Sequence, residues 1–290
     1  MIHVLTLVSQ SNDVASLAKA APGGAGDVLD RSGGGWNIAE RDVGNDAGLV
    51  SWLEAETPGA GADWAITPKA NRKKRLLISD MDSTIIGQEC LDELADFAGL
   101  KAEVSAITER AMRGELDFAG ALTQRVAMLK GLNLGALEAC HRERVRLNPG
   151  ARELVATMKA HGARSVLVSG GFGYFTSRVA KMAGFDADRA NTLIDDGAAL
   201  TGEVKMPILG REAKLTALLE ETAALGLTAD DAVALGDGAN DLDMIKAAGL
   251  GIAYHAKPIV AAQTTARIQH TDLRAALFFQ GYAVGDLVSA

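Results

Sequence analysis

Short apolar runs alternate with longer helical patterns over the last three quarters of the chain. Three runs, at residues 76–79, 165–168 and 232–235, are almost continuously apolar, which is typical of strands buried on both faces of a parallel sheet. Helical periodicity occupies residues 151–161 and 212–225, and such helices supply the crossovers that parallel strands require. The pattern therefore predicts an α/β fold with a mostly parallel sheet.

A long insertion between the first two predicted strands has a helical pattern. It covers about residues 90–148, where apolar side chains such as Leu91, Leu94 and Ala98 recur at helical spacing. Open α/β sheets bind ligands beyond the carboxyl ends of their strands, so an insertion at this place lies over the binding cleft. We expect these residues to form a helical cap.

The first 70 residues differ from the rest, because they are rich in glycine and contain all three tryptophans. Residues 2–8 are typical of a strand and residues 46–56 of a helix. We expect a small α+β domain at 1–70, followed by a catalytic domain at 71–290. The basic run at 68–75 is interpreted as a solvated linker, since a targeting or nucleic-acid patch is less common in an acidic chain.

Composition narrows the classes of partner. The 290 residues are 48% hydrophobic and 23% charged, as in soluble globular proteins, and the net charge of −8 disfavours nucleic acid. That charge does not disfavour a small phosphorylated substrate, because a metal and a few cations can reverse the field inside one cleft. No apolar run reaches the roughly 18 residues of a membrane span, and the first residues lack a secretory signal's basic region. With only Cys90 and Cys140 present, we expect a cytoplasmic protein without a membrane partner.

Two carboxylates follow the first predicted strand directly. Asp80 and Asp82 are two residues apart, so one can attack phosphorus while the other handles the proton of the leaving group. By itself, such a pair is more often a capped turn. Residues 236–241 follow the third of these strands and offer Asp237, Asn240 and Asp241. These oxygen ligands suit Mg²⁺, although a glycine-rich turn is the simpler interpretation of this segment alone.

Two further positions carry chemistry suited to a phosphate group. Ser169, Gly170 and Gly171 follow the second strand, where a hydroxyl and free backbone N–H groups can bind phosphate oxygens. Considered alone, they are better explained as a tight turn between a strand and a helix. Lys214 lies near the start of a predicted helix and can neutralise a phosphoryl charge, but an isolated lysine is usually only solvated.

Together these four clusters, in this order and each after a predicted strand or at a helix start, resemble the signature of the haloacid dehalogenase-like phosphatases. The resemblance covers about residues 75–280. It implies a Rossmann-like parallel sheet core of the haloacid dehalogenase-like type with a helical cap insertion, to which the small N-terminal α+β domain expected from the pattern is added.

A narrower resemblance links residues 80–95 and 111–118 to the opening and cap motifs of phosphoserine phosphatases. It implies that Glu89 binds the ammonium group of the substrate, that Phe118 closes over it, and that Arg125 binds its carboxylate. Without the motifs, pairing of Glu89 and Arg125 with each other or with solvent is the simpler interpretation. Cys90 and Met206 depart from the usual residues of the family, at positions without a chemical role.

The resemblance also implies a mechanism, in which O-phospho-L-serine is hydrolysed to L-serine and phosphate through an aspartyl-phosphate, the last step of serine biosynthesis. Asp80 would be the nucleophile, and Asp82 would act first as acid and then as base. Mg²⁺ would be held by Asp80, the backbone carbonyl of Asp82, and Asp237. The remaining residues would bind substrate (Ser169, Gly170, Gly171, Lys214 and Asn240) or stand behind the metal (Asp241).

Alternatives stay open at this point. Another phosphomonoester such as phosphohomoserine or a sugar phosphate is one, although a sugar offers no partner for Glu89 and Arg125. A phosphorylated amino-acid-sensing protein without turnover is another, which Asp82 disfavours because a passive receiver needs no general acid. The first 70 residues faintly resemble the extra N-terminal domain of longer bacterial phosphoserine phosphatases, often compared with ACT modules. Regulation by an amino acid and a homodimer through this domain therefore stay open.

Overall fold

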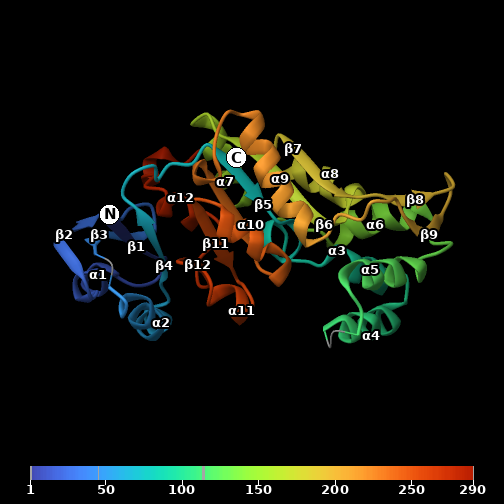
Figure 1. The fold of residues 1–290 in the computed structure, drawn as a ribbon, viewed down its shortest axis with the longest axis horizontal. Coiled ribbons are helices and arrows are strands. Elements are labelled where there is room, and N and C mark those ends of the chain that lie inside the picture. The colour runs from blue at the N-terminus through green and yellow to red at the C-terminus, as the bar shows by residue number, and fades with distance from the viewer. Residues whose placement is uncertain (1, 45, 113–114, 290) are drawn as a thin grey trace.

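The computed structural model describes residues 2–44, 46–112 and 115–289. Within them, one large sheet has the strand order β2-β3-β1-β4-β12-β11-β10-β5-β6-β7 (Figure 1). Its strands are β1 (His3–Ser9), β2 (Gly24–Asp30), β3 (Asn37–Val43), β4 (Asp63–Pro68), β5 (Leu76–Ser79), β6 (Arg164–Phe172), β7 (Ala187–Asn191), β10 (Ala232–Gly236), β11 (Leu250–Tyr254) and β12 (Ala266–Ile268).

The half of this sheet from β12 to β7 is parallel. Its helices are α7 (Ala151–Ala160), α8 (Gly173–Ala183), α9 (Arg211–Ala224), α10 (Leu242–Ala247), α11 (Pro258–Ala261) and α12 (Ala275–Phe279). In β5, Leu77 belongs to the apolar core that contains α7, α8 and α12, whereas Leu76 and Ile78 belong to the core beneath α9 and α10. Alternate residues thus face opposite helical layers, which explains the continuous apolar runs and confirms the predicted α/β core.

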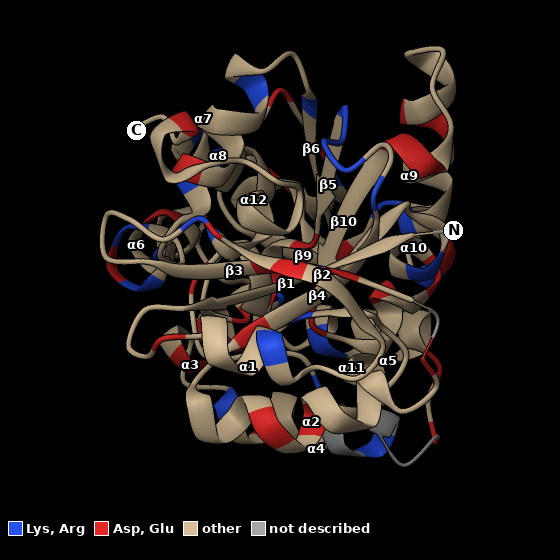
Figure 2. Cartoon of the chain, turned by 90° about the vertical axis from the view of Figure 1, so that its left-hand side faces the viewer, with Lys and Arg blue, Asp and Glu red and all other residues tan. Residues whose placement is uncertain are grey.

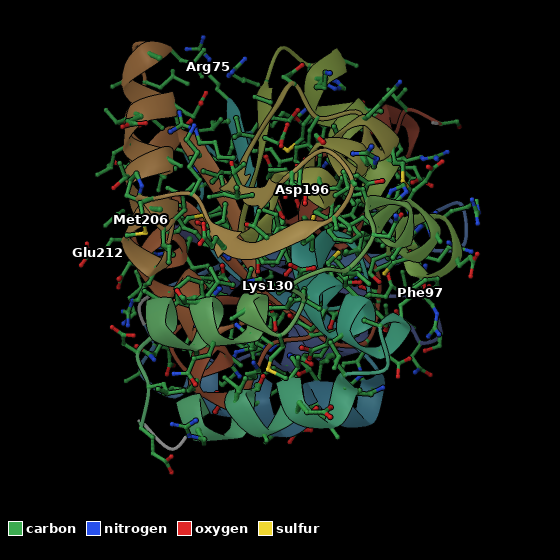
Figure 3. All side chains as sticks on the ribbon, turned by 90° about the vertical axis from the view of Figure 1, so that its right-hand side faces the viewer. Arg75, Phe97, Lys130, Asp196, Met206 and Glu212 are labelled. Atoms are coloured by element: carbon green, nitrogen blue, oxygen red, sulfur yellow. The ribbon has the colours of Figure 1, made fainter. Side chains whose placement is uncertain are left out.

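The cap is also helical, as predicted, and consists of α3 (Cys90–Phe97), α4 (Lys101–Met112), α5 (Phe118–Ala127) and α6 (Leu134–Arg144). A hairpin of β8 (Leu193–Asp195) and β9 (Leu200–Val204) joins it, with Gly131 N donating to Leu200 O at 2.8 Å. Figure 3 looks onto this end of the molecule, where Lys130 and Asp196 are labelled. The sequence did not predict this hairpin, which returns from the core to widen the cap.

The N-terminal module, defined as β1 to β4 with α1 (Ala15–Ala20) and α2 (Leu49–Ala60), has the strand and helix order of a split βαβ fold. It lies at the opposite end of the long axis from the cap (Figure 1). Its strand β4 pairs antiparallel with β12, and Trp36 packs edge-on against Phe278 with ring centroids 4.9 Å apart. The module therefore extends the parallel part of the sheet, and a division of the chain near residue 70 stays a prediction.

The basic segment that joins the two parts is less solvated than expected. Arg72 Nη2 lies 2.8 Å from Glu40 Oε1 and also donates to Phe279 O, while the mostly buried Lys74 donates to Asp230 O at 2.7 Å. The interpretation as a solvated linker is therefore wrong for Arg72 and Lys74, because their charges are bound at the junction. Seen from the module's side, acidic and basic residues are interspersed (Figure 2).

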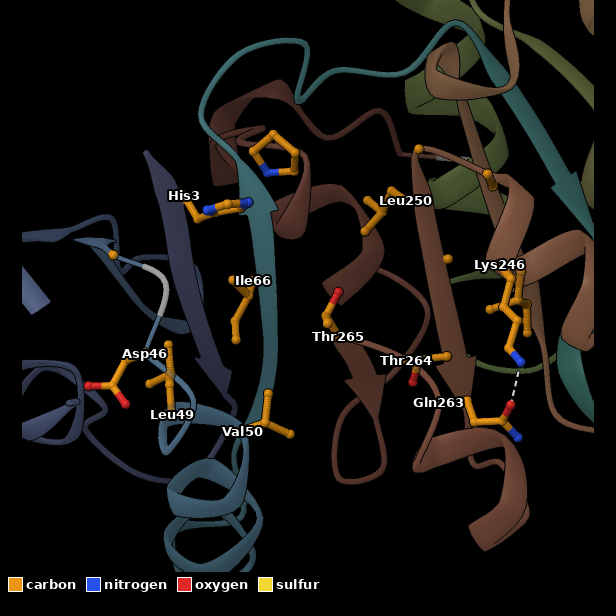
Figure 4. A pocket seen from close by; sticks show the side chains of 16 residues that line it. His3, Asp46, Leu49, Val50, Ile66, Lys246, Leu250, Gln263, Thr264 and Thr265 are labelled. Atoms are coloured by element: carbon orange, nitrogen blue, oxygen red, sulfur yellow. Dashed lines mark hydrogen bonds between the residues drawn. The ribbon is translucent and has the colours of Figure 1, made fainter. Parts of the chain in front are cut away.

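A groove of about 460 Å³ runs along this junction. Val50 and Ile66 line it from the module, and Lys246 and Leu250 line it from the core (Figure 4). Within the described residues its lining includes no predicted site residue. Every helix in the described part of the chain is too short or too polar to span a lipid bilayer.

Candidate active site

The carboxyl ends of the parallel strands meet the cap around a cavity of about 140 Å³. Most of the predicted site residues line it, from the strand ends and from the cap: Asp80, Asp82, Glu89, Phe118, Arg125, Ser169, Gly170, Gly171, Asp237 and Asn240. The other two, Lys214 and Asp241, lie against Asp80. Residues 113–114 of the predicted cap motif lie outside the described residues.

A buried cluster of charges stands beside this cavity. Oxygen atoms of Asp80, Asp237 and Asp241 lie within 4.8 Å of one another, and Lys214 Nζ lies 2.7 Å from Asp80 and 2.6 Å from Asp241. Burial and the Asp241 carboxylate raise the pKa of Asp80 well above its usual range, and burial raises that of Asp237 to about 6. One ammonium group cannot balance three carboxylates, so the donor set suits a divalent cation with a preference for oxygen.

The second oxygen of Asp241 is fixed by the backbone. Asp241 Oδ2 accepts a hydrogen bond from Gly238 N at 3.0 Å, while Oδ1 accepts from Lys214. Gly236 allows this approach, because a β-carbon there would lie 2.4 Å from Asp241 Cγ. Gly236 and Gly238 thus allow the backbone of this loop to approach the Asp241 carboxylate. Asp241 can therefore hold both Lys214 and the loop in place.

Asp82 has an environment unlike that of Asp80. The chain turns sharply after β5 through η1 (Met81–Ile85), where Ser83 has a φ of 53°. Asp82 Oδ1 accepts from Cys90 N at 2.9 Å, and Oδ2 accepts from Ser169 Oγ at 3.3 Å. Burial, with the nearby Glu89 charge, raises the pKa of Asp82 to about 7. A carboxyl group with this pKa can both donate and accept a proton near neutral pH.

The predicted phosphate-binding segment is part of an irregular strand and does not open a helix. Strand β6 continues to Phe172, α8 begins at Gly173, and the pairing of β6 with β7 shifts register after Val168. Gly171 N donates to Ser169 Oγ at 2.9 Å. A β-carbon on Gly171 would lie 3.1 Å from Asp82 Oδ2, so this position leaves room beside the carboxylate.

Glu89, just before α3, and Arg125 on α5 give the cavity one acidic and one basic side chain. Glu89 Oε1 accepts from Ser83 Oγ at 2.7 Å, and Arg125 Nε donates to Ala121 O at 3.4 Å. Burial lowers the pKa of Arg125, and the charges of Asp92 and Glu89 oppose this effect. Among the described residues, the structure contains no ion pair between Glu89 and Arg125, and both residues line the same cavity.

Some lining residues were missed at the level of sequence. Lys257 lines the cavity, and its backbone N donates to Asp237 O at 3.0 Å. It follows strand β11, so the same rule that identified Asp80 and Asp237 would have found it. Leu91 and Leu122 supply apolar surface from the cap, and their helical spacing marked them only as core residues.

Comparisons with known proteins agree with this geometry. Residues 77–246 match the sequence profile of the haloacid dehalogenase-like hydrolases. The phosphoserine phosphatase of Polaromonas sp. is 48% identical over 204 residues, which cover 69% of this chain and 86% of that protein. The phosphoserine phosphatase of Streptococcus thermophilus is 47% identical over 200 residues, which cover 69% of this chain and 93% of that protein.

Two solved structures resemble almost the whole chain. A haloacid dehalogenase family hydrolase from Salmonella enterica serovar Typhi matches 96% of this chain and 98% of its own, with a TM-score of 0.86 and 28% identity. A probable phosphoserine phosphatase from Vibrio cholerae matches 98% of this chain and 88% of its own, with a TM-score of 0.81 and 33% identity. The N-terminal module is therefore included in both likenesses.

Proposed function

The chain belongs to the haloacid dehalogenase-like hydrolases, and on this premise we propose that it is a Mg²⁺-dependent phosphoserine phosphatase. The observation that supports phosphoserine as the substrate is the cavity of about 140 Å³, which is lined by Asp80, Asp82, Glu89 and Arg125. Phosphoserine presents a phosphate, an ammonium group and a carboxylate, so each of its charged groups has a partner there. The cavity is far smaller than the several hundred Å³ common for larger ligands, which suits a small metabolite.

We propose that Asp80 is the nucleophile. Its carboxylate attacks phosphorus, the bond between phosphorus and the serine oxygen breaks, and Asp82 gives its proton to that oxygen. In the second half, Asp82 takes a proton from water while the water oxygen attacks phosphorus and the bond to Asp80 breaks. The hydrogen bond of Asp82 to Cys90 N and the contact with Ser169 Oγ would hold the acid in place. L-serine and phosphate are the products.

Asp80, Asp237 and the backbone carbonyl of Asp82 would hold Mg²⁺, with Asp241 behind the metal. When bound, the cation would offset negative charge on the phosphoryl oxygens. Lys214 would neutralise part of the same charge, while Ser169, Gly170, Gly171 and Asn240 would bind the phosphoryl group. The surplus of negative charge in this buried cluster supports the proposed metal site.

Glu89 and Arg125 would bind the ammonium and carboxylate groups of the substrate, and Phe118 would close the cavity. We also propose a cytoplasmic location, since Cys90 and Cys140 are buried free thiols, as in a reducing compartment. A homodimer through the N-terminal module and an ACT-like role for that module stay predictions.

A hydrolysis screen tests the proposed function. We expect Mg²⁺-dependent phosphate release from phosphoserine, much slower release from glucose 6-phosphate, and none with chelator or in Asp80→Asn. Including phosphothreonine and phosphohomoserine defines the limits of the site. Faster turnover of the sugar phosphate would contradict the assigned substrate. A single phosphorylation of the protein without release of phosphate would identify a receiver-like sensor instead.

A further inference from the structure

We propose that Gly210 is a positioning residue for closure of the cap: with Gly170 it forms the seat on which the Phe118 ring rests. The inference deepens the proposed function and rests on it, since it concerns access to the same site. In the closed arrangement, the seated ring separates the active-site cavity from a larger outer cavity. Gly210 stands outside all the motifs that the sequence revealed.

The outer cavity lies directly beyond Phe118. It has a volume of about 1100 Å³, between the start of α5, strand β7 and the start of α9. Phe118 lines both this cavity and the active-site cavity of about 140 Å³. Glu212, labelled in Figure 3, belongs to the outer wall. The aromatic ring therefore lies between the small polar site and the larger outer cavity.

Two glycines support this ring from the core. A β-carbon on Gly170 would lie 3.0 Å from Phe118 Cζ, and one on Gly210 would lie 3.3 Å from Phe118 Cδ1. Both distances are shorter than ordinary contacts between carbon atoms of about 3.5–4.0 Å. A β-carbon at either glycine would therefore require the ring to shift by a few tenths of an ångström, and a branched side chain would require a larger shift.

The backbone does not explain why residue 210 is glycine. Its φ of −102° and ψ of −154° belong to extended backbone that any residue adopts. Gly210 is also the N-cap of α9 and makes no side-chain cap hydrogen bond, although serine or aspartate would stabilise such a position. The remaining reason is space, and the group that occupies this space is the Phe118 ring.

The ring is not enclosed in a packed core, because Phe118 is 37% exposed at the first position of α5. Its movement away from Gly170 and Gly210 would join the two cavities and allow phosphoserine to enter or products to leave. Its return would exclude bulk water while the phosphoryl group is transferred. Bulk at residue 210 would therefore bias the cap towards the open arrangement without touching a reacting group.

A double-mutant cycle tests this proposal. We expect Gly210→Val to reduce kcat/KM for phosphoserine roughly 10-fold or more when Phe118 is present, and about 2-fold or less in Phe118→Ala, because the clashing ring is gone. Gly173→Ala is the matched control, since Gly173 also lines the outer cavity but its β-carbon would meet Asn191 O at an ordinary 3.6 Å. That variant should keep the wild-type kcat/KM, and unfolding curves would verify that all variants fold.

Equal losses of kcat/KM from Gly210→Val with and without the Phe118 ring would contradict the proposal that Gly210 positions this ring. The substitution would then act through α9 and Lys214. An unchanged kcat/KM in Gly210→Val with Phe118 present would contradict the proposal as well. Failure of the proposed function is separate: wild-type protein would then hydrolyse another phosphomonoester in preference to phosphoserine. The same double-mutant cycle would then be measured with that ester. The coupling between residues 210 and 118 would still support or contradict the role of Gly210 in positioning Phe118.

Discussion

The ammonium group of Lys214 lies 2.7 Å from a carboxylate oxygen of Asp80, and the two side chains are only 2% and 6% exposed. Burial opposes the charge of Lys214, but Asp80 and Asp241 outweigh it and raise the pKa of the ammonium group. The lysine is therefore charged at every physiological pH. It joins the residue we propose as nucleophile to the buried carboxylate of Asp241.

Replacing Lys214 with methionine should lower kcat by about 10²–10³-fold, because a fixed cation at the phosphoryl group is lost. The metal-free variant should also unfold at a lower temperature, since buried carboxylates lose their partner. Lys246→Met is the control: Lys246 is an exposed lysine on α10 whose ammonium binds Gln263. Activity of Lys214→Met within about twofold of wild type would remove Lys214 from the proposed machinery.

Asp82→Asn should slow phosphoserine hydrolysis by about 10²–10⁴-fold and hydrolysis of 4-nitrophenyl phosphate far less, because a good leaving group needs little protonation. The pKa of about 7 for Asp82 also predicts how the rates of the two steps change with pH. Formation of the phosphoenzyme needs protonated Asp82 and should slow as pH rises through about 7, whereas its breakdown needs the carboxylate and should slow below that pH. Rapid-quench measurement of both steps checks this, and equal losses on the two substrates would contradict the acid role.

Metal binding should stabilise the protein more at high pH than at low pH. Because the folded-state pKa values of Asp237, at about 6, and Asp82, at about 7, are raised, these two groups bind more protons in the folded metal-free protein than in the unfolded chain between pH about 4 and 7. Their contribution to stability should therefore fall as pH rises through this window. Mg²⁺ replaces these protons, so its gain in Tm should be larger at pH about 8 than at pH about 5. Asp237→Asn should reduce the gain, and a gain independent of pH would contradict the metal site.

Much of the core and of the site could be predicted because their signals are local. Leu77 and Ile78 face different helical layers, so β5 carries a continuous apolar run, and Asp80 follows it immediately. The hairpin β8–β9 was missed because its strands have only three and five residues, of which two are buried, and carry almost no pattern. The pairing of β4 with β12 was missed because it joins residues far apart in the chain, such as Ala65 and Ala266, which no local pattern encodes.

Specificity can be separated from chemistry at Arg125 and Glu89. Truncating one partner of a charge-assisted contact costs on the order of 2–5 kcal/mol, so Arg125→Ala should lower kcat/KM for phosphoserine roughly 10- to 1,000-fold. An aryl phosphate has neither an ammonium group nor a carboxylate, so its hydrolysis should be little affected by Arg125→Ala or Glu89→Gln. Arg144→Ala is a matched control, because Arg144 pairs with Glu93 on the exposed surface of the cap. Equal losses on both substrates would leave a phosphatase of unassigned substrate.

The N-terminal module is bound to the core by more than strand pairing. Asp63 in β4 accepts hydrogen bonds from the backbone N–H groups of Gln269, His270 and Thr271 at 2.6, 3.0 and 2.8 Å. Trp36 belongs to the main apolar core with Phe278. Removal of the module would expose the edge of β12 and this aromatic contact, and the loop that Asp63 orders would lose its acceptor.

A protein that begins at Arg72 should therefore unfold at a Tm lower by roughly 10 °C or more, since several kcal/mol of buried contacts are lost. Its soluble fraction should still release phosphate with Mg²⁺, because every proposed catalytic residue follows residue 72 and the Streptococcus thermophilus relative matches 69% of this chain over 93% of its own length. Trp36→Ala in the full chain should reproduce part of the loss of stability without loss of kcat. A folded truncation without turnover would show that the module contributes to the active site, and an unchanged Tm would show that it is an independent domain.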